Sequence, residues 1–532
     1  MELLRLLREH NPEKFRLLIG SSILTGGLMS WLFSFLAGSI AYYENQEISI
    51  RPNLFIIGWI LWMVSYRFQQ NQLLQMVHEI LEKIRNGILD HLRKISLRDF
   101  EKIEKSQINN VLTYDMDVIL DASHVLAYLL TDFVIFLGVL IFLAWISFKV
   151  ALITALIMLV CIVVYYLHQT SIQTFIEKGR EQERQLFNAI QHQIFGFKEL
   201  RMNDAKNDDY YHLELCRELD QMRDVKIKVG TEFDKNYLFT LLFWNFLIII
   251  VVYVLPTFGV ITKEVMIAAV AIVLYIPLWR LMEAVPLVTT ANLSVRKILE
   301  LEDEIMDLRQ ESLTGTEAFV QEELTEIRFE EIQFEYLDAQ KKHLFTLGPI
   351  NLTFQPGNIY FITGGNGSGK STLVKVITGL YTPGKGSVYR NTHLIPAGVQ
   401  REWISAVFSD YHLFDRVYSD QPVNTDQMKE LLSKMHLDHK TEFHEDKFSN
   451  YSLSSGQRRR LALILALIEE KPVYVFDEWA ADQDPVFRDA FYHEFLPQLK
   501  ARGKIVIVVS HDDHYYDLAD QQIRMEEGKL VT

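Results

Sequence analysis

The residues with the clearest chemical potential form a glycine-rich loop in the second half of the 532-residue chain. They fit the pattern G-x-x-x-x-G-K-[ST] and are Gly364, Gly365, Asn366, Gly367, Ser368, Gly369, Lys370, Ser371 and Thr372. Glycines let successive backbone N–H groups turn inward around phosphate oxygens. Lys370 would reach the β- and γ-phosphates, and the Ser371 hydroxyl would bind Mg²⁺. A β-branched and aromatic run precedes the loop and an apolar run follows it, which predicts a strand, a phosphate-binding loop and a helix.

Two carboxylates and a histidine follow other apolar runs. The run 471–476 ends at Asp477 and Glu478, and the run 504–510 ends at His511. Residues at the carboxyl ends of parallel strands lie where phosphates bind. Asp477 suits the Mg²⁺ shell together with Ser371, Glu478 could polarise an attacking water, and His511 could contact the γ-phosphate. An acidic pair or a single histidine after a strand is common, so the combination carries the argument.

An aromatic residue could complete this site. Tyr336 ends an alternating run, 328–336, that is typical of a strand, and it lies 28 residues before the phosphate-binding loop. Its ring could pack in a core or stack on an adenine base. Together with the other motifs, the pattern favours stacking.

The composition indicates a membrane part joined to a soluble part. Hydrophobic residues make up 49% of the chain, yet 23% of the residues are charged. A net charge of -15 without a block of Lys and Arg argues against a nucleic-acid-binding protein. The two cysteines, Cys161 and Cys216, do not suggest a disulfide framework, so we expect a reducing cytosolic compartment for the soluble part.

The elements before the phosphate-binding loop predict an α-helical membrane domain. Six apolar runs are long enough to span a membrane, and they are 17–42, 54–77, 125–146, 150–167, 237–260 and 265–286. Long charged segments with helical periodicity separate some of them, at 78–124 and 168–236. Lys and Arg gather in these segments, which predicts that they and both termini are cytoplasmic. Buried helices of a large soluble protein would not explain the number and spacing of the runs.

Some charged residues inside these runs need an explanation. Asp132 lies in the third run, and Arg280 and Glu283 lie near the inner end of the sixth. A charge in hydrocarbon costs at least ~2.5 kcal/mol, so each side chain should face a partner, a cavity or the interface. Structural pairing or snorkelling is the simpler interpretation, and lining a transport pathway is the alternative.

A composition change separates two domains. After residue 290 the apolar runs stop and acidic residues accumulate. We therefore expect a membrane domain at 1–290, a linker at 291–324 and a nucleotide-binding domain at 325–532. The nucleotide-binding domain should have an α/β P-loop fold.

A further motif makes a family resemblance specific. Before an apolar helix that begins near Leu461, the chain carries the run Leu453, Ser454, Ser455, Gly456 and Gln457. The chain resembles an exporter-type ABC transporter half-unit, in which a membrane domain precedes an ATPase domain. The family signature is L-S-G-G-Q, and Ser455 stands here where the family has glycine. Segments at 99–100, 115–117 and 196–200 also resemble those that precede or form exporter coupling helices.

The resemblance implies roles for the motifs in one ATP site. It implies ATP and Mg²⁺ as cofactors, Tyr336 as the aromatic loop and Asp484 as part of the D-loop. The signature residues, Ser454, Ser455, Gly456 and Gln457, would act on the ATP of a partner subunit. One chain carries one set of each motif, so the resemblance implies a homodimer with two ATP sites.

Departures from the family narrow the assignment. Ser409 stands where the family has the glutamine of the Q-loop, and the segment between Ser409 and the signature is short. With the run 406–415, this combination is similar to bacterial exporters of cyclic or modified peptides and peptide siderophores, of the pyoverdine, syringomycin and lasso-microcin types. No cysteine precedes the first apolar run, which argues against a leader-trimming protease domain and predicts a mature solute.

The expected protein is therefore a multi-pass protein of the bacterial inner membrane that contacts lipid and exports a peptide-like solute by alternating access. The expected nucleotide-binding domain lies in the cytoplasm. Two alternatives remain open: a flippase for lipids or lipid-linked glycans, and a membrane-anchored regulatory ATPase that moves nothing. The sequence does not identify an outer-membrane partner.

Overall fold

The computed structural model describes residues 2–42, 52–259, 266, 278–308, 322–337, 343–396, 398–418 and 422–531. They form two compact units. The first comprises Met1–Asp90 and Glu104–Met306, and the second comprises His91–Ile103 and Asp307–Thr532.

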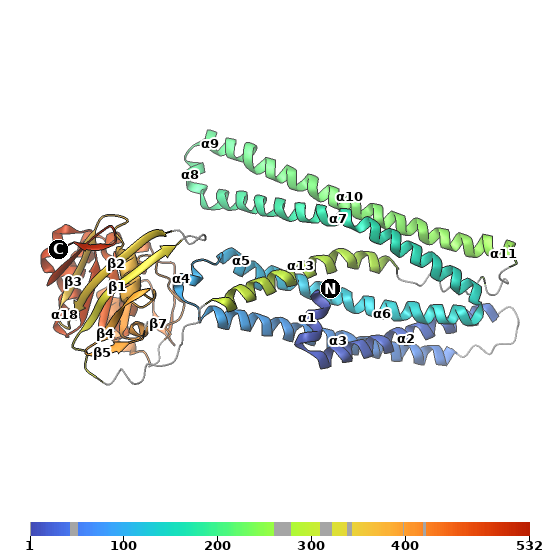
Figure 1. Cartoon of the computed structure of the whole chain (residues 1–532), viewed down its shortest axis with the longest axis horizontal. Coiled ribbons are helices and arrows are strands. Elements are labelled where there is room, and N and C mark those ends of the chain that lie inside the picture. The colour runs from blue at the N-terminus through green and yellow to red at the C-terminus, as the bar shows by residue number, and fades with distance from the viewer. Residues whose placement is uncertain are drawn as a thin grey trace. The chain divides into compact units, whose positions relative to one another are not determined.

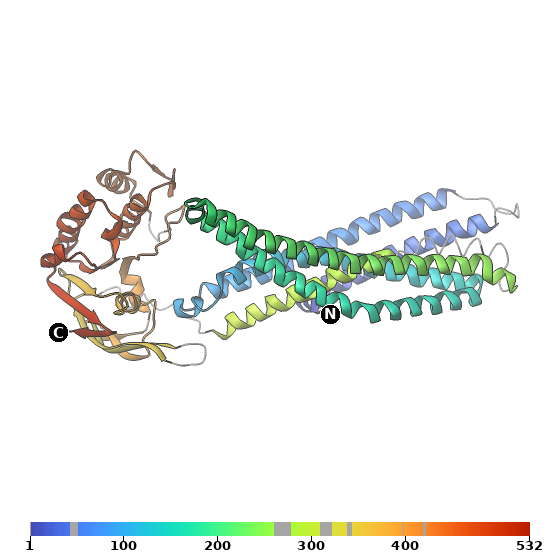
Figure 2. The same ribbon diagram turned by 90° about the horizontal axis from the view of Figure 1, so that it is seen from above.

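The first unit consists of long helices that run lengthwise through it (Figure 1). Its main helices are α1 (Glu2–His10), α2 (Pro12–Tyr42), α3 (Pro52–Leu92), α6 (Met116–Ile146), α7 (Phe148–Phe195), α10 (Cys216–Ile249) and α13 (Leu278–Asp307). Shorter helices join them: α5 (Lys105–Asn110), α8 (Phe197–Arg201), α9 (Asp204–Asp209) and α11 (Leu255–Thr257). Figure 2 shows α7 and α10 side by side, as their packing also indicates. The long charged segments 78–124 and 168–236 are thus largely helical, as their periodicity predicts.

The number of membrane spans stays a prediction. Among the described residues, two helical stretches are long and apolar enough to cross a membrane, Pro12–Ser39 and Lys105–Ile146. The start of α7 adds a shorter apolar stretch, Phe148–Ile157. Most of the sixth expected span, 265–286, lies outside the described residues.

Small residues let α2 and α6 pack closely. A Cβ atom added to Gly138 would lie 2.2 Å from Ser30 Oγ, and one added to Gly26 would lie 2.8 Å from the Thr131 carbonyl oxygen. Neither distance leaves room for a larger side chain without movement of a helix. Close backbone approach through small residues is a common way to hold membrane helices together.

A polar cluster lies inside the same helix group. Gln69 on α3 donates hydrogen bonds to Ser22 Oγ (2.9 Å) and Thr131 Oγ1 (2.7 Å), and all three residues are buried. Asp132, the next residue on α6, is also buried. Asp132 therefore lies within helix packing, which agrees with a structural role. Arg280 and Glu283 lie on α13, but their side chains are outside the described part of the chain.

The second unit is an α/β fold built on a six-stranded sheet in the order β12-β11-β3-β10-β9-β6. Strands β11, β3, β10, β9 and β6 run parallel to one another, and β12 is antiparallel to β11. The bounds are β3 (Ile359–Gly364), β6 (Ile404–Val407), β9 (Val473–Asp477), β10 (Ile505–Val509), β11 (Gln521–Glu526) and β12 (Lys529–Val531). An antiparallel sheet in the order β2-β1-β4-β5 packs beside it. Its strands are β1 (Ile327–Leu337), β2 (His343–Phe354), β4 (Lys385–Arg390) and β5 (His393–Ile395).

Helices cover the parallel sheet of this unit. They are α14 (Lys370–Ile377), α15 (Thr425–Lys434), α16 (Ser455–Ile468), α17 (Pro485–Ala490) and α18 (Leu496–Ala501), and a small hairpin joins β7 (Phe443–His444) to β8 (Lys447–Phe448). Alternate residues of β10 enter different cores: Ile507 lies in one hydrophobic cluster and Val508 in the other. Both faces of the strand are therefore buried, which explains its continuous apolar sequence.

Candidate nucleotide-binding and hydrolysis site

The order of the parallel strands gathers the expected site residues at one edge of the sheet. The phosphate-binding loop follows β3, and Asp477 and Glu478 end and follow β9. His511 lies two residues beyond β10, which runs between β3 and β9. Ser409 lies two residues beyond β6, the other neighbour of β9. The strands at 358–363, 471–476 and 504–510 and the helix after the loop are confirmed.

The phosphate-binding loop has the backbone that its glycines predict. Gly364 has φ +145° and Gly369 has φ +99°, a region that favours glycine. A Cβ atom on Gly364 would also lie 2.3 Å from the Met525 carbonyl oxygen. Lys370 is buried at the start of α14, and its Nζ donates to the carbonyl oxygens of Gly364 and Gly365, both at 3.0 Å. The lysine thus lies folded over the loop that would hold phosphate.

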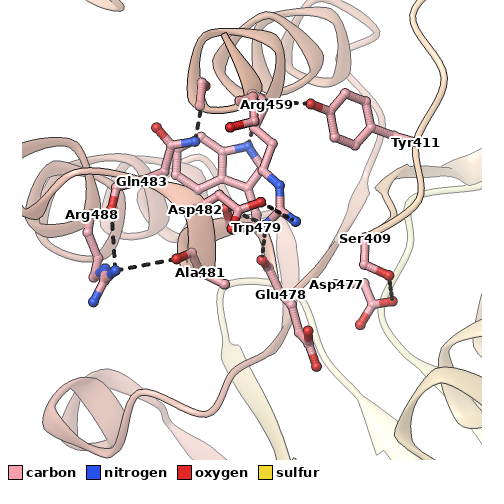
Figure 3. A network of polar contacts seen from close by, with 12 residues as sticks. Ser409, Tyr411, Arg459, Asp477, Glu478, Trp479, Ala481, Asp482, Gln483 and Arg488 are labelled. Carbon is pink, nitrogen blue, oxygen red and sulfur yellow. Dashed lines mark hydrogen bonds and ion pairs between the residues drawn. The ribbon is translucent and has the colours of Figure 1, made fainter. Parts of the chain in front are cut away.

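Asp477 is buried at the end of β9 with Ser409 beside it (Figure 3). Ser409 Oγ donates to Asp477 Oδ2 at 3.4 Å, a long hydrogen bond. Burial raises the pKa of the Asp477 carboxyl, and the charge of Glu478 adds to this effect. The hydrogen bonds from the Ser409 side chain and backbone act in the opposite direction. A divalent cation at this position would favour the ionised form.

Glu478 and His511 face each other. Glu478 Oε1 lies 3.2 Å from His511 Nε2, and both side chains are partly exposed. Glu478 has φ +52°, an uncommon left-handed conformation for a residue with a side chain. Strained backbone at a polar strand end is a frequent feature of functional sites.

Tyr336 belongs to an aromatic and polar cluster that the sequence does not reveal. Its hydroxyl donates to the Tyr381 hydroxyl at 3.0 Å. Tyr381 is buried against Phe334 and also donates a short hydrogen bond to Glu101. Lys375 on α14 forms an ion pair with Glu101 at 2.8 Å. Burial and the Glu101 carboxylate raise the pKa of the Tyr381 hydroxyl, so it remains a hydrogen-bond donor at neutral pH.

Glu101 comes from the segment His91–Ile103, which lies between the two parts of the first unit in sequence but belongs to the second unit. In this segment, α4 (Leu97–Phe100) begins at Ser96, whose side chain accepts a hydrogen bond from the Asp99 backbone. Arg98 donates to the Glu335 carbonyl oxygen at 3.0 Å and lies over the Phe334 ring. The segment therefore contacts the strand that carries Tyr336. Asp99 and Phe100 in this segment belong to the sequence that resembles those preceding or forming exporter coupling helices.

The signature residues form the start of α16. Ser454 and Gln457 form a capping box: Gln457 N donates to Ser454 Oγ (3.3 Å), and Ser454 N donates to Gln457 Oε1 (3.0 Å). Ser454 and Ser455 are exposed, so the helix end is open to a ligand. Asp484 caps α17 by accepting from the Val486 and Phe487 backbones.

A network connects α16 to the loop 478–484, here called the Glu478 loop (Figure 3). Arg459 contacts the backbone oxygens of Glu478 and Trp479. Arg488 contacts the backbone oxygen of Gln483 from the other side of the loop. Sequence reasoning missed Arg459, Tyr381 and Glu101, because their roles arise from tertiary contacts across long sequence separations.

The residues present fit a magnesium nucleotide. Among the described residues, Ser368 Oγ is buried in the phosphate-binding loop with no hydrogen-bond partner. A buried polar atom of this kind is expected where a ligand supplies the partner. The same loop carries Lys370 and backbone amides, and Asp477 ends the nearby strand β9; such groups bind phosphate and Mg²⁺.

The fold and this site define the class of protein. The ABC transporter family model matches residues 347–481, and the ABC transporter transmembrane region matches residues 15–278. The chain belongs to the ABC transporters, as an exporter-type half-unit that hydrolyses ATP and has its membrane domain first.

Individual relatives are more specific. The chain is 33% identical over 464 residues to the ATP-binding protein SyrD of Pseudomonas syringae pv. syringae, which covers 83% of this chain and 81% of that protein. It is 27% identical over 248 residues to the subtilin transport ATP-binding protein SpaT of Bacillus subtilis, covering 43% of this chain and 40% of that protein. It is also 21% identical over 514 residues to the ATP-dependent lipid A-core flippase of Wigglesworthia glossinidia brevipalpis, covering 92% and 86%.

Proposed function

We propose that this protein is a homodimeric exporter that uses ATP to move a mature, cyclic or otherwise modified peptide across the bacterial inner membrane. The observation that carries ATP hydrolysis is the convergence of the phosphate-binding loop, Asp477, Glu478 and His511 at one sheet edge. The exporter class follows from the two domain types in one chain.

The residues divide the work of hydrolysis among them. Mg²⁺·ATP would supply the reactive γ-phosphate when bound. Lys370 and the loop amides would hold its phosphates, and Ser371 and Asp477 would hold the metal. Glu478 would accept a proton from the attacking water, and His511 would orient Glu478 through their 3.2 Å contact. Tyr336 would stack on the adenine.

The exposed start of α16 supports pairing of two chains. Its helix N-terminus presents backbone N–H groups and the side chains of Ser454 and Ser455 to an anion. In a homodimer this end would meet the γ-phosphate bound by the partner. Asp484 would sit near the dimer axis as part of the D-loop.

The relatives support a peptide-like solute. SyrD matches most of both chains, and the subtilin transport protein matches 43% of this chain. The lipid A-core flippase aligns over an even larger share of this chain, although at lower identity. Lipid flipping is therefore the second candidate, and a regulatory ATPase without transport is the third.

We also propose a topology. Six spans would place both termini, the segments 78–124 and 168–236 and the ATPase domain in the cytoplasm. We propose domain boundaries at 1–290 and 325–532 with a linker between them. The first linker residues continue helix α13. A solute cavity between the two membrane domains would open inward before ATP binding.

Stimulation of ATP hydrolysis tests the solute class. The full chain would be reconstituted in lipid vesicles and assayed with compact mature peptides, unstructured peptides of equal composition, and lipid-linked sugars. We expect the compact peptides alone to raise turnover, because ordering a flexible peptide costs ~1–2 kcal/mol per residue. Stimulation by lipid-linked sugars and by no peptide would refute peptide export and favour the flippase.

A further inference from the structure

Arg459 links α16, the helix that begins with the signature residues, to Glu478, the residue that follows strand β9. It is the fifth residue of α16, and its side chain is only 11% exposed. Its Nη1 donates to the backbone oxygens of Glu478 (2.5 Å) and Trp479 (3.2 Å), and its Nη2 lies 3.0 Å from Asp482 Oδ2. One guanidinium therefore holds three acceptors of the Glu478 loop (Figure 3).

The connection also runs in the opposite direction. The indole Nε1 of Trp479 donates to the Arg459 carbonyl oxygen at 2.8 Å. Gln483 Nε2 donates to the Gly456 carbonyl oxygen at 3.2 Å. The N-terminal part of α16 thus contacts four residues of the Glu478 loop: Glu478, Trp479, Asp482 and Gln483. Trp479 is buried, so it adds a rigid packed contact to these hydrogen bonds.

Arg459 contacts one of the two peptide groups that flank Glu478, and other hydrogen bonds hold both of them. Glu478 N donates to the Val509 carbonyl oxygen at 3.1 Å, which fixes the peptide before its side chain. Its own carbonyl oxygen accepts from Arg459 and from Ala481 N at 3.3 Å. The left-handed conformation of Glu478 is unfavourable for a residue with a side chain, so it persists only when neighbouring contacts impose it. Arg459 supplies the charged contact.

We propose that Arg459 is a positioning residue for Glu478, and that the signature helix thereby sets the orientation of the catalytic carboxylate in its own subunit. This inference rests on the proposed function, in which Glu478 accepts the proton. Because the same helix end would bind the partner's ATP, a change at one ATP site would reach the glutamate of the other. Arg459 touches neither substrate nor metal in this arrangement.

The ion pair with Asp482 does not explain the placement of Arg459. The Asp482 side chain is 51% exposed, and exposed ion pairs contribute little. The buried guanidinium is instead aimed at backbone oxygens. Asp482→Asn should therefore retain most of the activity.

Steady-state kinetics of the full-length protein test the inference. Arg459→Met should lower kcat on the order of 10²-fold, the cost of misplacing a reacting group by about 1 Å. The KM for ATP should stay within about twofold of wild type, because no group that binds ATP is removed. Arg459→Lys should recover part of the loss through one retained donor. Arg458→Met, on the exposed side of the same helix, is the matched control.

A double-mutant cycle separates this inference from the proposed role of Glu478. If Arg459 acts through Glu478, adding Arg459→Met to Glu478→Gln should cause no further loss in single-turnover hydrolysis. Losses that multiply, or an Arg459→Met kcat within about twofold of wild type, would overturn the inference. Normal turnover of Glu478→Gln alone would instead contradict the proposed function. If Arg459→Met does not fold, Arg459→Lys takes its place in the same cycle and the same criteria apply.

Discussion

Replacement of Ser409 by alanine tests whether this serine, at the position of the Q-loop glutamine, supports Mg²⁺ binding. The structure places the Ser409 hydroxyl 3.4 Å from Asp477 Oδ2, while the Ser409 backbone makes a second hydrogen bond to the same carboxylate. Ser409→Ala removes the first bond and keeps the second. We expect a small loss of Mg²⁺ affinity, because Ser409 would reach the metal only through water.

The size of this loss follows from the geometry. A hydrogen bond to a charged group contributes ~1.5–3 kcal/mol with good geometry, but a distance near 3.5 Å lies at the outer limit. We assign about 0.5 kcal/mol, which corresponds to roughly a twofold loss in Mg²⁺ affinity. Ser371→Ala removes a proposed direct ligand and should cost tenfold or more.

The pH dependence supplies a second criterion. The pKa of Asp477 is already raised by burial, and the Ser409 hydroxyl counteracts the rise. Ser409→Ala should therefore raise this pKa further, so that more of the carboxyl is protonated in acidic buffer. Protonated Asp477 binds Mg²⁺ poorly, so the difference between variant and wild type should grow as the pH falls and shrink as it rises.

Titration of ATPase activity with Mg²⁺ at fixed ATP, in acidic and mildly alkaline buffers, measures both effects. Ser409→Gln, which introduces the family residue, is an informative companion variant and should bind Mg²⁺ at least as well as wild type. Equal losses for Ser409→Ala and Ser371→Ala would show that Ser409 is a direct ligand. A loss that does not change with pH would refute the link to Asp477.

Three other changes test separate parts of the structure. Glu478→Gln should leave ATP binding intact and lower kcat by 10² or more, as measured by phosphate release; near-normal turnover would move the base to His511. Tyr381→Phe removes the hydroxyl that holds Tyr336 and should weaken ATP binding by about fivefold, or ~1 kcal/mol, without changing kcat, as fluorescent-nucleotide titration can show; unchanged affinity would contradict the link. Gly138→Leu should lower the yield of monodisperse protein in gel filtration because its Cβ would meet Ser30 Oγ at 2.2 Å, whereas Gly27→Leu, where an added Cβ meets nothing within 4 Å, should not; equal yields would contradict the close packing.

Much of the ATPase domain could be predicted because its local sequence and its tertiary structure agree. The apolar runs that end at Asp477 and before His511 form adjacent parallel strands. Such strands are buried on both faces, which is why their sequences are continuously apolar. The phosphate-binding loop needs glycine at positions such as Gly364, and this demand leaves a readable pattern. Motif spacing and strand patterning therefore predict most of the catalytic edge.

The contacts that connect these motifs could not be predicted. Arg459 is one of three consecutive arginines, and nothing in the run shows which side chain turns toward Glu478. Glu101 lies 280 residues from Tyr381, in a segment whose sequence resembles other charged helical stretches. Such pairings depend on the packing of separate elements. The membrane helices present the same difficulty, since apolar runs do not encode which faces meet.

The central claim is outward transport of a compact peptide driven by ATP. The most direct measurement is accumulation of a labelled, mature cyclic peptide in inverted membrane vesicles that contain the full-length protein, with Lys370→Ala vesicles as the matched control. We predict uptake that requires ATP and Mg²⁺ and that is lost in the Lys370→Ala vesicles, which should hydrolyse no ATP. ATP-dependent uptake into right-side-out vesicles energised from the cytoplasmic face, or normal hydrolysis without movement of any peptide tested, would contradict the account.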